Sequence, residues 1–361
     1  EQEGEIMKKI LVFGEKYFHY TDSTVYALEQ LGFEVKVVYM PLLQSKELSI
    51  WEHLQYKINR NSFCQKYYEY KKLQIQNEVS EYKPDIFFSI NGNAYYEFID
   101  KKLIMMLRDI KCKSYVWYMD TVKRFENIEQ NIRLFDEVLS FEPMDVAYFK
   151  EKYDKEARYL PIGVAEQLFC KSSKSEKKYD VSFVGNSTEN RLAVLDEVAK
   201  YCTANNKSMI VFGHYWHNKH FWQAYFAKRS FARKYPYLVK YVTNSFLHDQ
   251  EVAELYNTSR ISLNIHIALH KGINPRTFEV LADGNFELCD YREDAKKIGL
   301  IDGNNIVMYN NAEECVKKIK CYLNNEEDCL KIAKAGKEFV MKNYTMKKLL
   351  ADVLKKDGLD E

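Results

Sequence analysis

The chain has 361 residues, 46% of them hydrophobic, and its 53 basic residues are balanced by 52 acidic ones. This length predicts two domains, each with its own core, and the balanced charge gives no indication of a nucleic-acid partner. Tyrosine is frequent and glycine scarce, with 28 and 13 residues, which excludes a low-complexity or disordered chain. The sequence contains no apolar run of about 18 residues, so no membrane-spanning helix is expected.

The eight cysteines form no Cys-x-x-Cys pair and do not cluster with histidines. Most lie in apolar stretches, which is typical of buried free thiols. A chain of this length does not depend on a disulfide framework, so a reducing cytoplasm is expected. No signal peptide is recognised, and the polar residues 1–6 are excluded from the fold, which is expected to begin at Met7.

The N-terminal half alternates short apolar strands with amphipathic helices. The expected strands are Lys9–Phe13, Glu34–Tyr39, Asp85–Ile90, Ser114–Tyr118 and Glu137–Phe141. The expected helices include Ser23–Leu31, Trp51–Tyr82 and Tyr96–Arg108. This alternation predicts a parallel sheet covered on both faces, and hence an N-terminal Rossmann-like domain over residues 7–165.

A polar segment separates this half from a second series of alternating strands and helices. Ala157–Cys170 contains Pro161 and Gly163, and residues 171–178 are rich in serine and lysine, as linkers are. The expected strands that follow are Asp180–Val184, Ser208–Phe212, Arg260–Ile265, Asn285–Cys289 and Asn305–Met308. The expected helices are Arg191–Cys202, Arg276–Ala282 and most of Ala312–Lys356. This series predicts a second Rossmann-like domain over residues 179–342.

The segment Gly272–Gly284, with the sequence GINPRTFEVLADG, carries the most chemistry. Pro275 starts a helix, and Arg276 and Glu279, three residues apart, share one face near its N-terminus. A helix N-terminus attracts phosphate, and a guanidinium group binds two phosphate oxygens at once. A carboxylate one turn later can accept hydrogen bonds from ribose hydroxyls. The alternative interpretation is a surface Arg–Glu pair without a functional role.

A second candidate segment is Phe183–Arg191, with the sequence FVGNSTENR. Gly185 ends a strand, where a glycine lets the backbone approach a ligand beyond the carboxyl end of the sheet. The alternative is an ordinary strand-to-helix turn capped by Ser187 or Thr188. The segment contains neither the dinucleotide fingerprint G-x-G-x-x-G nor a Walker loop.

Together these segments resemble the CgeB-like family, which comprises GT-B glycosyltransferases related to glycosyltransferase group 1. The similar motifs are Val184-Gly185-Asn186 followed by Arg191, Ser262–His266 (SLNIH), Asn274-x-Arg276-x-Phe278 to Gly284, and Ile332-Ala333-x-x-Gly336. The resemblance covers residues 180–344 well. The N-terminal half is similar more loosely, chiefly through Val116–Thr121 (VWYMDT), which resembles the family's W-x-x-D segment.

The resemblance implies a GT-B fold, in which two Rossmann-like domains face each other across a cleft and residues 343–361 cross back to the first domain as a helix. It implies a nucleoside-diphosphate sugar donor, most readily a UDP-sugar, bound mainly by the second domain, with no further cofactor and no metal required. Glu279 would hold the ribose, and Arg276 and Arg191 the diphosphate. The remaining expected donor-site residues are Gly185, Asn186, His266, Lys271, Asn274 and Thr277.

One position departs from the family pattern and leaves the stereochemistry open. Many retaining relatives carry two glutamates eight residues apart, but here Lys271 takes the place before Glu279. The positive charge of Lys271 would neutralise phosphate instead. An inverting transfer needs a general base that faces the acceptor. The candidates are Asp120, at a strand end, and His19, in the loop after the first strand; alternatively, Asp120 caps a turn and His19 has a packing role.

The histidine pattern does not predict a metal site. His266 and His270 are four residues apart, and His214, His217 and His220 lie close together. No carboxylate or thiol accompanies either set at ligand spacing, so no metal is expected.

Residues 198–248 contain no acidic residue at all, and the part over 216–241 combines basic with large aromatic side chains. The residues concerned are Trp216, Lys219, Trp222, Phe226, Lys228, Arg229, Phe231, Arg233, Lys234, Tyr235 and Lys240. This combination suits peripheral association with an anionic membrane or a phosphate-bearing acceptor. RNA is not expected, because no RNA-binding motif accompanies it. The alternative is a helix packed by its aromatic residues with a solvated basic face.

These observations predict a cytoplasmic glycosyltransferase that acts on a glycan, lipid-linked or protein acceptor, with the donor on the second domain and the acceptor on the first. One alternative is a nucleotide-sugar 2-epimerase of similar fold, which needs additional acid/base carboxylates that the sequence does not show. Another is a non-catalytic nucleotide-binding protein, which the presence of Arg276 and Glu279 disfavours. A dinucleotide-dependent dehydrogenase is disfavoured because its glycine fingerprint is missing.

Overall fold

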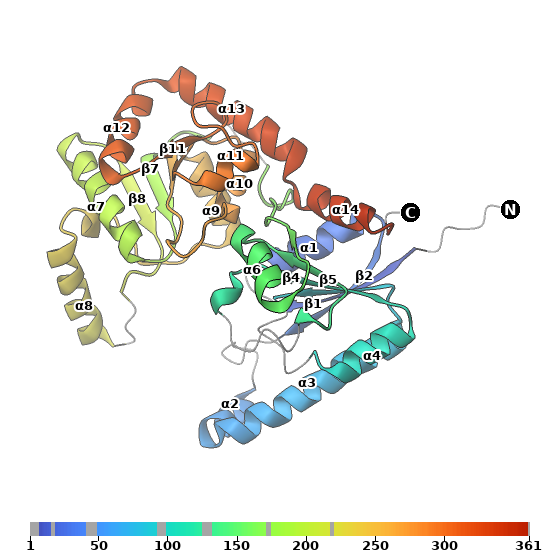
Figure 1. Cartoon of the computed structure of the whole chain (residues 1–361). Coiled ribbons are helices and arrows are strands. Elements are labelled where there is room, and N and C mark those ends of the chain that lie inside the picture. The colour runs from blue at the N-terminus through green and yellow to red at the C-terminus, as the bar shows by residue number, and fades with distance from the viewer. Residues whose placement is uncertain are drawn as a thin grey trace. The chain divides into compact units, whose positions relative to one another are not determined.

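The computed structural model of the chain describes residues 7–15, 19–40, 49–91, 99–124, 132–170, 175–216 and 220–359. It divides into two compact units. Unit 1 comprises Glu1–Ile162 together with Leu349–Glu361, and unit 2 comprises Gly163–Lys348. Each unit contains one parallel sheet with helices on both faces (Figure 1).

The sheet of unit 1 has the strand order β2-β1-β3-β4-β5-β6, and every pairing is parallel. The strands are β1 (Lys9–Glu15), β2 (Glu34–Met40), β3 (Ile86–Ile90), β4 (Lys113–Tyr118), β5 (Glu137–Ser140) and β6 (Arg158–Tyr159). The central strands are apolar without alternation because both of their faces are covered. β2 and β3 lie on opposite sides of β1, so the strand order reverses between β1 and β3.

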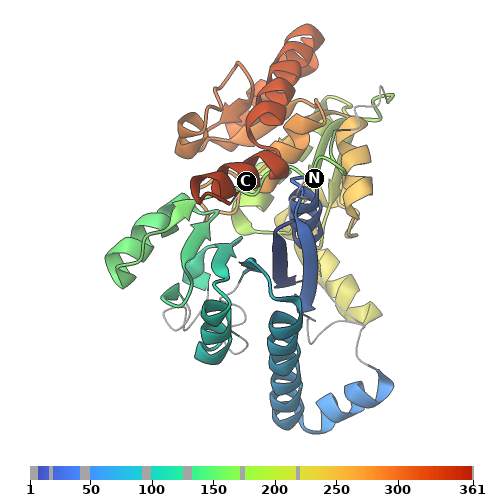
Figure 2. The ribbon, with the colours of Figure 1, turned by 90° about the vertical axis from the view of Figure 1, so that its right-hand side faces the viewer.

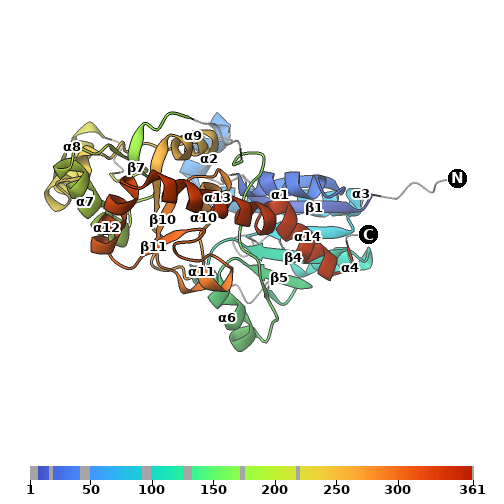
Figure 3. The same cartoon turned by 90° about the horizontal axis from the view of Figure 1, so that it is seen from above.

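Helices cover both faces of this sheet. The helices α3 (Arg60–Tyr82), α4 (Lys101–Asp109) and α6 (Pro143–Tyr153) pack on one face through a shared core. The helices α1 (Tyr20–Glu29) and α14 (Met346–Lys356) lie on the face opposite α3 and α4 (Figures 1 and 3). Asp357, just after α14, accepts hydrogen bonds from the Tyr115 hydroxyl at 2.6 Å and from Arg158 Nη2 at 2.7 Å. These contacts fix the end of the chain against β4 and β6.

The single helix expected over Trp51–Tyr82 is two helices, α2 (Ile50–Ile58) and α3. Asn59 separates them because its backbone, at φ −143° and ψ 80°, leaves the helical region, and its side chain caps α3 by accepting from the Ser62 N–H. Figure 2 shows α2 and the start of α3 standing away from the sheet of unit 1.

The sheet of unit 2 has the order β11-β10-β9-β7-β8, again entirely parallel. Its strands are β7 (Tyr179–Val184), β8 (Met209–Phe212), β9 (Ser259–Asn264), β10 (Glu287–Asp290) and β11 (Val307–Tyr309). The helices α7 (Glu189–Ala204) and α12 (Ala312–Leu323) pack on one face, and α9 (Asp249–Asn257) and α10 (Pro275–Ala282) on the other. The remaining helices are α8 (Phe221–Lys234), α11 (Glu293–Lys297) and α13 (Glu326–Asn343).

The predicted fold class is confirmed, and every expected strand is present within two residues of its predicted ends. The sequence did not predict β6, α6, α9 or α11. The helix expected over Tyr96–Arg108 begins at Lys101, and residues 92–98 lie outside the described part. Residues 163–170 belong to unit 2 rather than to a linker, because Val164 donates to the Tyr344 carbonyl and accepts from the Met346 N–H, both at 2.9 Å.

All eight cysteines lie among the described residues and are free thiols. Within the described ranges, no helix has the length and apolar character needed to cross a membrane.

Candidate functional site

The candidate site lies where the strand order of unit 2 reverses. β7 and β9 are neighbours in the sheet although β8 lies between them in sequence. Gly185 follows β7, and Ile265 and His266 follow β9, so both segments emerge at the same carboxyl edge. In open α/β sheets, ligands bind beyond the carboxyl ends of the strands at such a reversal.

Arg191, the third residue of α7, ties these two segments together. Its side chain is buried, with Nε donating to the Ile265 carbonyl at 2.7 Å and Nη1 to the Asn186 carbonyl at 3.0 Å. The preceding residue, Asn190, donates to the His266 carbonyl at 2.8 Å. The sequence predicted a phosphate contact for Arg191, whereas these bonds show that it also positions both strand ends.

Two glycines allow the turns after β7 and β8 to approach each other closely. Gly213 has φ +142°, and a Cβ atom on it would lie 2.0 Å from the Gly185 carbonyl oxygen. A Cβ atom on Gly185 would lie 3.2 Å from Arg191 Nη1. The edge beside β7 is therefore formed by backbone, and Asn186, the next residue, is exposed. Such a surface suits the close approach of a ligand.

A buried polar network supports the N-terminus of α10. Asn274 caps the helix by accepting from the Thr277 N–H at 3.2 Å. Asn264 Nδ2 lies 2.9 Å from Asn274 Oδ1, 3.1 Å from Thr277 Oγ1 and 2.8 Å from Glu287 Oε1. The Thr277 hydroxyl also donates to Glu287 Oε1, at 2.9 Å. Burial raises the pKa of Glu287 from 4.5 to about 7.

Positive charge is concentrated at this edge. Burial, followed by the nearby charge of Arg276 in the first turn of α10, lowers the pKa of Arg191 from 12.5 to about 10. The positive charge of Arg276 therefore acts on the Arg191 guanidinium, as a secondary cause after burial. Glu279, one turn after Arg276, is 7% exposed, whereas Lys271 is exposed.

His266 forms a second polar cluster with Asp290 and Arg292. Asp290 Oδ1 lies 2.7 Å from both the backbone nitrogen and Nδ1 of His266. Arg292 forms an ion pair with the other oxygen of Asp290 and donates to the His270 carbonyl at 2.8 Å. Burial acts to raise the pKa of Asp290, but the contacts with His266 and Arg292 outweigh it and lower that pKa to about 2.

The protonation state of His266 follows from this arrangement. Its side chain is fully buried, and burial lowers its pKa even though Asp290 opposes the shift. A neutral imidazole beside an ionised Asp290 carries its proton on Nδ1, which leaves a lone pair on Nε2. Nε2 makes no hydrogen bond within the described residues. This atom is therefore a buried acceptor.

The two candidate bases follow strands of unit 1. His19 precedes α1 and is buried, with Nδ1 3.1 Å from the Ser23 hydroxyl. Asp120 follows β4, is half-buried and accepts from the Thr121 N–H at 2.8 Å. This bond is to the next residue along the chain, and the side chain that accepts from an N–H two residues on is that of Thr121, from Lys123. The role of Asp120 as a base stays a prediction.

The sequence did not single out three residues that build the site in unit 2: the buried Asn264 and Glu287, and the partly buried Asp290. A sequence signal existed for Glu287 and Asp290, because both are carboxylates in the short apolar strand β10. A buried carboxylate needs partners, but the sequence does not reveal which. No group of His, Cys, Asp or Glu that could hold a metal ion is found in the part that the structure describes. His217 and Lys219 lie outside that part.

Two parallel Rossmann-like units of this kind define the GT-B class of proteins. Sucrose-phosphate synthase from Thermosynechococcus elongatus aligns with a TM-score of 0.64 at 11% identity, covering 98% of this chain and 100% of that one. Anabaena HepE, solved in complex with UDP and glucose, aligns with a TM-score of 0.63 at 10% identity, covering 97% and 99%. At these identities the likeness shows the fold alone.

The family is shown by the sequence itself. Residues 167–355 match the model described as glycosyl transferase-like, and the chain belongs to this family. The spore protein CgeB of Bacillus subtilis is 22% identical over 288 residues, which cover 76% of this chain and 83% of CgeB. The predicted resemblance to the CgeB-like family is therefore confirmed, and the candidate donor residues of unit 2 all lie within the matched range.

Proposed function

We propose that the protein is a glycosyltransferase that moves a sugar from a nucleoside-diphosphate sugar to a glycan, lipid-linked or protein acceptor. The observation that carries the proposal is a pair of arginines in the first turns of the helices that follow the reversal in unit 2, Arg191 on α7 and Arg276 on α10. Two cations beside the starts of α7 and α10 form an anion site, because helix N-termini add partial positive charge. A diphosphate supplies the matching negative charge.

In this proposal each part of the donor has its own contact residues. Arg276 binds the diphosphate, with Lys271 as an exposed second cation, and Glu279 accepts hydrogen bonds from the ribose hydroxyls. The turn at Gly185 and Asn186 lets the ligand approach the backbone. Asn274 and Thr277 hold the start of α10 in place, as their hydrogen bonds indicate. His266, whose backbone nitrogen and Nδ1 both bond to Asp290, supports the end of β9 beside the site. HepE was solved with UDP and glucose, which supports a UDP-sugar as the first donor to test.

The transfer itself needs an acceptor nucleophile. If the configuration inverts, Asp120 or His19 in unit 1 acts as the general base that takes the proton from the acceptor hydroxyl. The bond between the anomeric carbon and the diphosphate then breaks, and the nucleoside diphosphate leaves with that electron pair. We assign no metal to this step. The cytoplasm is the proposed compartment, supported by eight free cysteines.

A donor panel tests the proposal. The full chain is incubated with UDP-, GDP-, ADP- and dTDP-sugars, and the release of nucleoside diphosphate is measured alongside binding of each diphosphate by calorimetry. One donor should be turned over faster than the others, with water or an added glycan as acceptor. Conversion of the sugar to its epimer would instead identify a 2-epimerase. Diphosphate binding without turnover would point to a non-catalytic nucleotide-binding protein, and absence of any binding would refute the donor site.

A further inference from the structure

Helix α8 carries large aromatic side chains on its outside. Phe221, Trp222, Tyr225 and Phe226 are 77%, 70%, 51% and 63% exposed, and no residue of α8 is buried. A helix that packs on a soluble protein normally turns such residues inward. The alternative interpretation, in which the aromatic residues pack this helix against the protein, is therefore wrong for Trp222 and Phe226 but is confirmed for Trp216, Phe231 and Tyr235, which contact one another.

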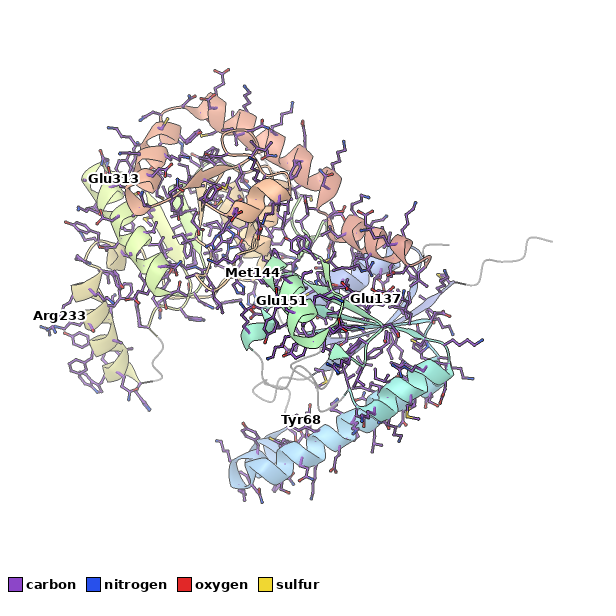
Figure 4. All side chains as sticks on the ribbon, in the orientation of Figure 1. Tyr68, Glu137, Met144, Glu151, Arg233 and Glu313 are labelled. Carbon is purple, nitrogen blue, oxygen red and sulfur yellow. The ribbon has the colours of Figure 1, made fainter. Side chains whose placement is uncertain are left out.

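Two arginines share this outward face. At about 100° per residue, the four aromatic side chains span an arc of about 140°, and Arg229 and Arg233 fall within the same arc. Figure 4 shows Arg233 among the side chains that project outward from α8. The outward face thus presents aromatic rings along the first turns of the helix and guanidinium groups along the last.

The opposite side of α8 holds the helix on unit 2. Phe231 packs against Tyr215, Trp216 and Tyr235, with ring centroids 5.9, 5.5 and 5.2 Å away. Near the end of the helix, Lys234 lies 3.6 Å from Glu189, the first residue of α7. The chain reaches α8 from the carboxyl end of β8 through residues 213–220. The segment after β8 and the start of α7 therefore hold α8 in place, and both also border the candidate donor site.

We propose that the outward face of α8 binds the surface of an anionic lipid bilayer. The aromatic rings enter the interface between headgroups and acyl chains, and Arg229 and Arg233 pair with lipid phosphates. Charge complementarity favours this occupant, because residues 198–248 contain no acidic residue that would repel anionic headgroups. The proposal is independent of the reaction that the enzyme catalyses.

Vesicle binding by the full-length protein tests the proposal. The protein should co-sediment at low salt with vesicles of phosphatidylglycerol and phosphatidylcholine, but much less with phosphatidylcholine alone, and added salt should release it. Lipids brominated near the headgroup should quench Trp222 fluorescence. Trp222→Tyr should keep most of the binding and lose that part of the quenching, because a tyrosine also partitions into the interface.

Two variants separate the aromatic from the charged contribution. Trp222→Ser combined with Phe226→Ser should weaken binding at least tenfold. Arg229→Gln combined with Arg233→Gln should weaken it about 25-fold, since each arginine near an anionic surface contributes about fivefold. The matched controls are Trp51→Ser, at a tryptophan of unit 1 that is 75% exposed, and Lys331→Gln with Lys334→Gln on the exposed side of α13. Both controls should bind vesicles like the wild type.

Three results would overturn the inference: no sedimentation with anionic vesicles at low salt, equal losses in the control variants, or a vesicle-free dimer that the Trp222→Ser and Phe226→Ser variant converts to monomer. The last result would make the face a contact between two copies of the chain. Calorimetry with nucleoside diphosphates keeps the two proposals apart, because the α8 variants should bind nucleotide normally. Vesicle binding without nucleotide binding would uphold this inference and refute the donor site.

Discussion

The candidate residues at the carboxyl edges of the two sheets differ in the hydrogen bonds described for them, although cross-element contacts occur at both edges, as Thr121 and Val122 show by bonding to Asp145 on α6 in unit 1. In unit 2 the contacts join separate elements: Arg191 on α7 bonds to the end of β9, and His266 after β9 bonds to Asp290 at the end of β10. In unit 1 the two candidate bases make contacts close to themselves in sequence, His19 with Ser23 and Asp120 with the Thr121 N–H.

This difference matches two different tasks. A diphosphate site must hold several positive groups near one another before the ligand binds. Buried donors that are hydrogen-bonded to neighbouring elements are already in position, so binding requires no further reorganisation. A general base acts on the acceptor hydroxyl during the transfer rather than on the bound diphosphate. We therefore expect substitutions at the edge of unit 2 to change stability and donor binding, and those at the edge of unit 1 to change turnover.

The largest effect is expected from Gly213→Ala. The added Cβ would lie 2.0 Å from the Gly185 carbonyl oxygen, and φ is +142°, so overpacking and backbone strain combine to about 4 kcal/mol of lost stability. Gly303→Ala is the matched control, because Gly303 also has positive φ, +75°, but nothing within 4 Å. Gly14 in unit 1 would meet side-chain atoms at 3.0 and 3.1 Å, so Gly14→Ala should cost less than Gly213→Ala.

Denaturant unfolding followed by circular dichroism measures these losses. Equal losses of stability in the Gly213 and Gly303 variants would show that the turns after β7 and β8 can move apart. The carboxyl edge of unit 2 would then not be rigid.

Glu287→Gln should change how stability depends on pH. The folded-state pKa of Glu287, about 7, is above the ordinary value of 4.5, so its ionisation opposes folding. The penalty is absent below about pH 4.5, grows as pH rises towards 7, and is full above it, where it amounts to on the order of 3 kcal/mol. Gln keeps the acceptor for Asn264 and Thr277 and removes the charge.

Thermal unfolding at pH 5 and pH 8 checks this expectation. The variant should lose less stability between these values than the wild type. Asp283, whose pKa burial also raises to about 7, is present in both proteins, so the difference isolates Glu287. If the stability of the two proteins depends on pH in the same way, Glu287 titrates with an ordinary pKa and water reaches the polar network around it.

Asp120→Asn tests the edge of unit 1. The amide keeps an oxygen for the Thr121 N–H, so the turn should survive while the proton acceptor is lost. Turnover with the donor found in the panel should fall about 100-fold, equivalent to about 2.7 kcal/mol, with unchanged affinity for the nucleoside diphosphate. His19→Gln is the parallel variant. If both retain full activity, the NMR of the product linkage should show a retained configuration.

The sequence predicted the strands well, because buried parallel strands are continuous apolar runs whose ends are marked by polar residues. It also placed Arg276 and Glu279 on one helix, and both lie on α10, while their roles in donor binding stay predictions. It did not identify Asn264, Thr277 and His266 as the partners of Glu287 and Asp290, because these contacts join β10 to segments 10 to 24 residues away in sequence. The outward aromatic face of α8 was equally inaccessible, since sequence composition does not say which side of a helix packs.

The smallest effects are expected for the residues proposed to bind the sugar donor, Arg276 and Glu279. Arg276→Ala should weaken both nucleoside diphosphate and free pyrophosphate, by about 1.5–3 kcal/mol, because a charge-assisted contact to phosphate is lost from both ligands. Glu279→Gln should weaken the nucleoside diphosphate by about 1 kcal/mol only, since a neutral amide oxygen accepts ribose hydroxyls less strongly.

The two ligands separate these roles in calorimetry. Pyrophosphate has no ribose, so Glu279→Gln should leave its affinity unchanged or slightly higher, because a negative charge near the phosphate site is removed. Arg229→Gln on the exposed face of α8 is the control for a distant lost cation and should leave both affinities unchanged. If Glu279→Gln weakens both ligands equally, the carboxylate acts by shaping the buried start of α10 rather than by binding ribose. The edge of unit 2 would then hold phosphate alone, and nucleotide selection would have to come from other residues.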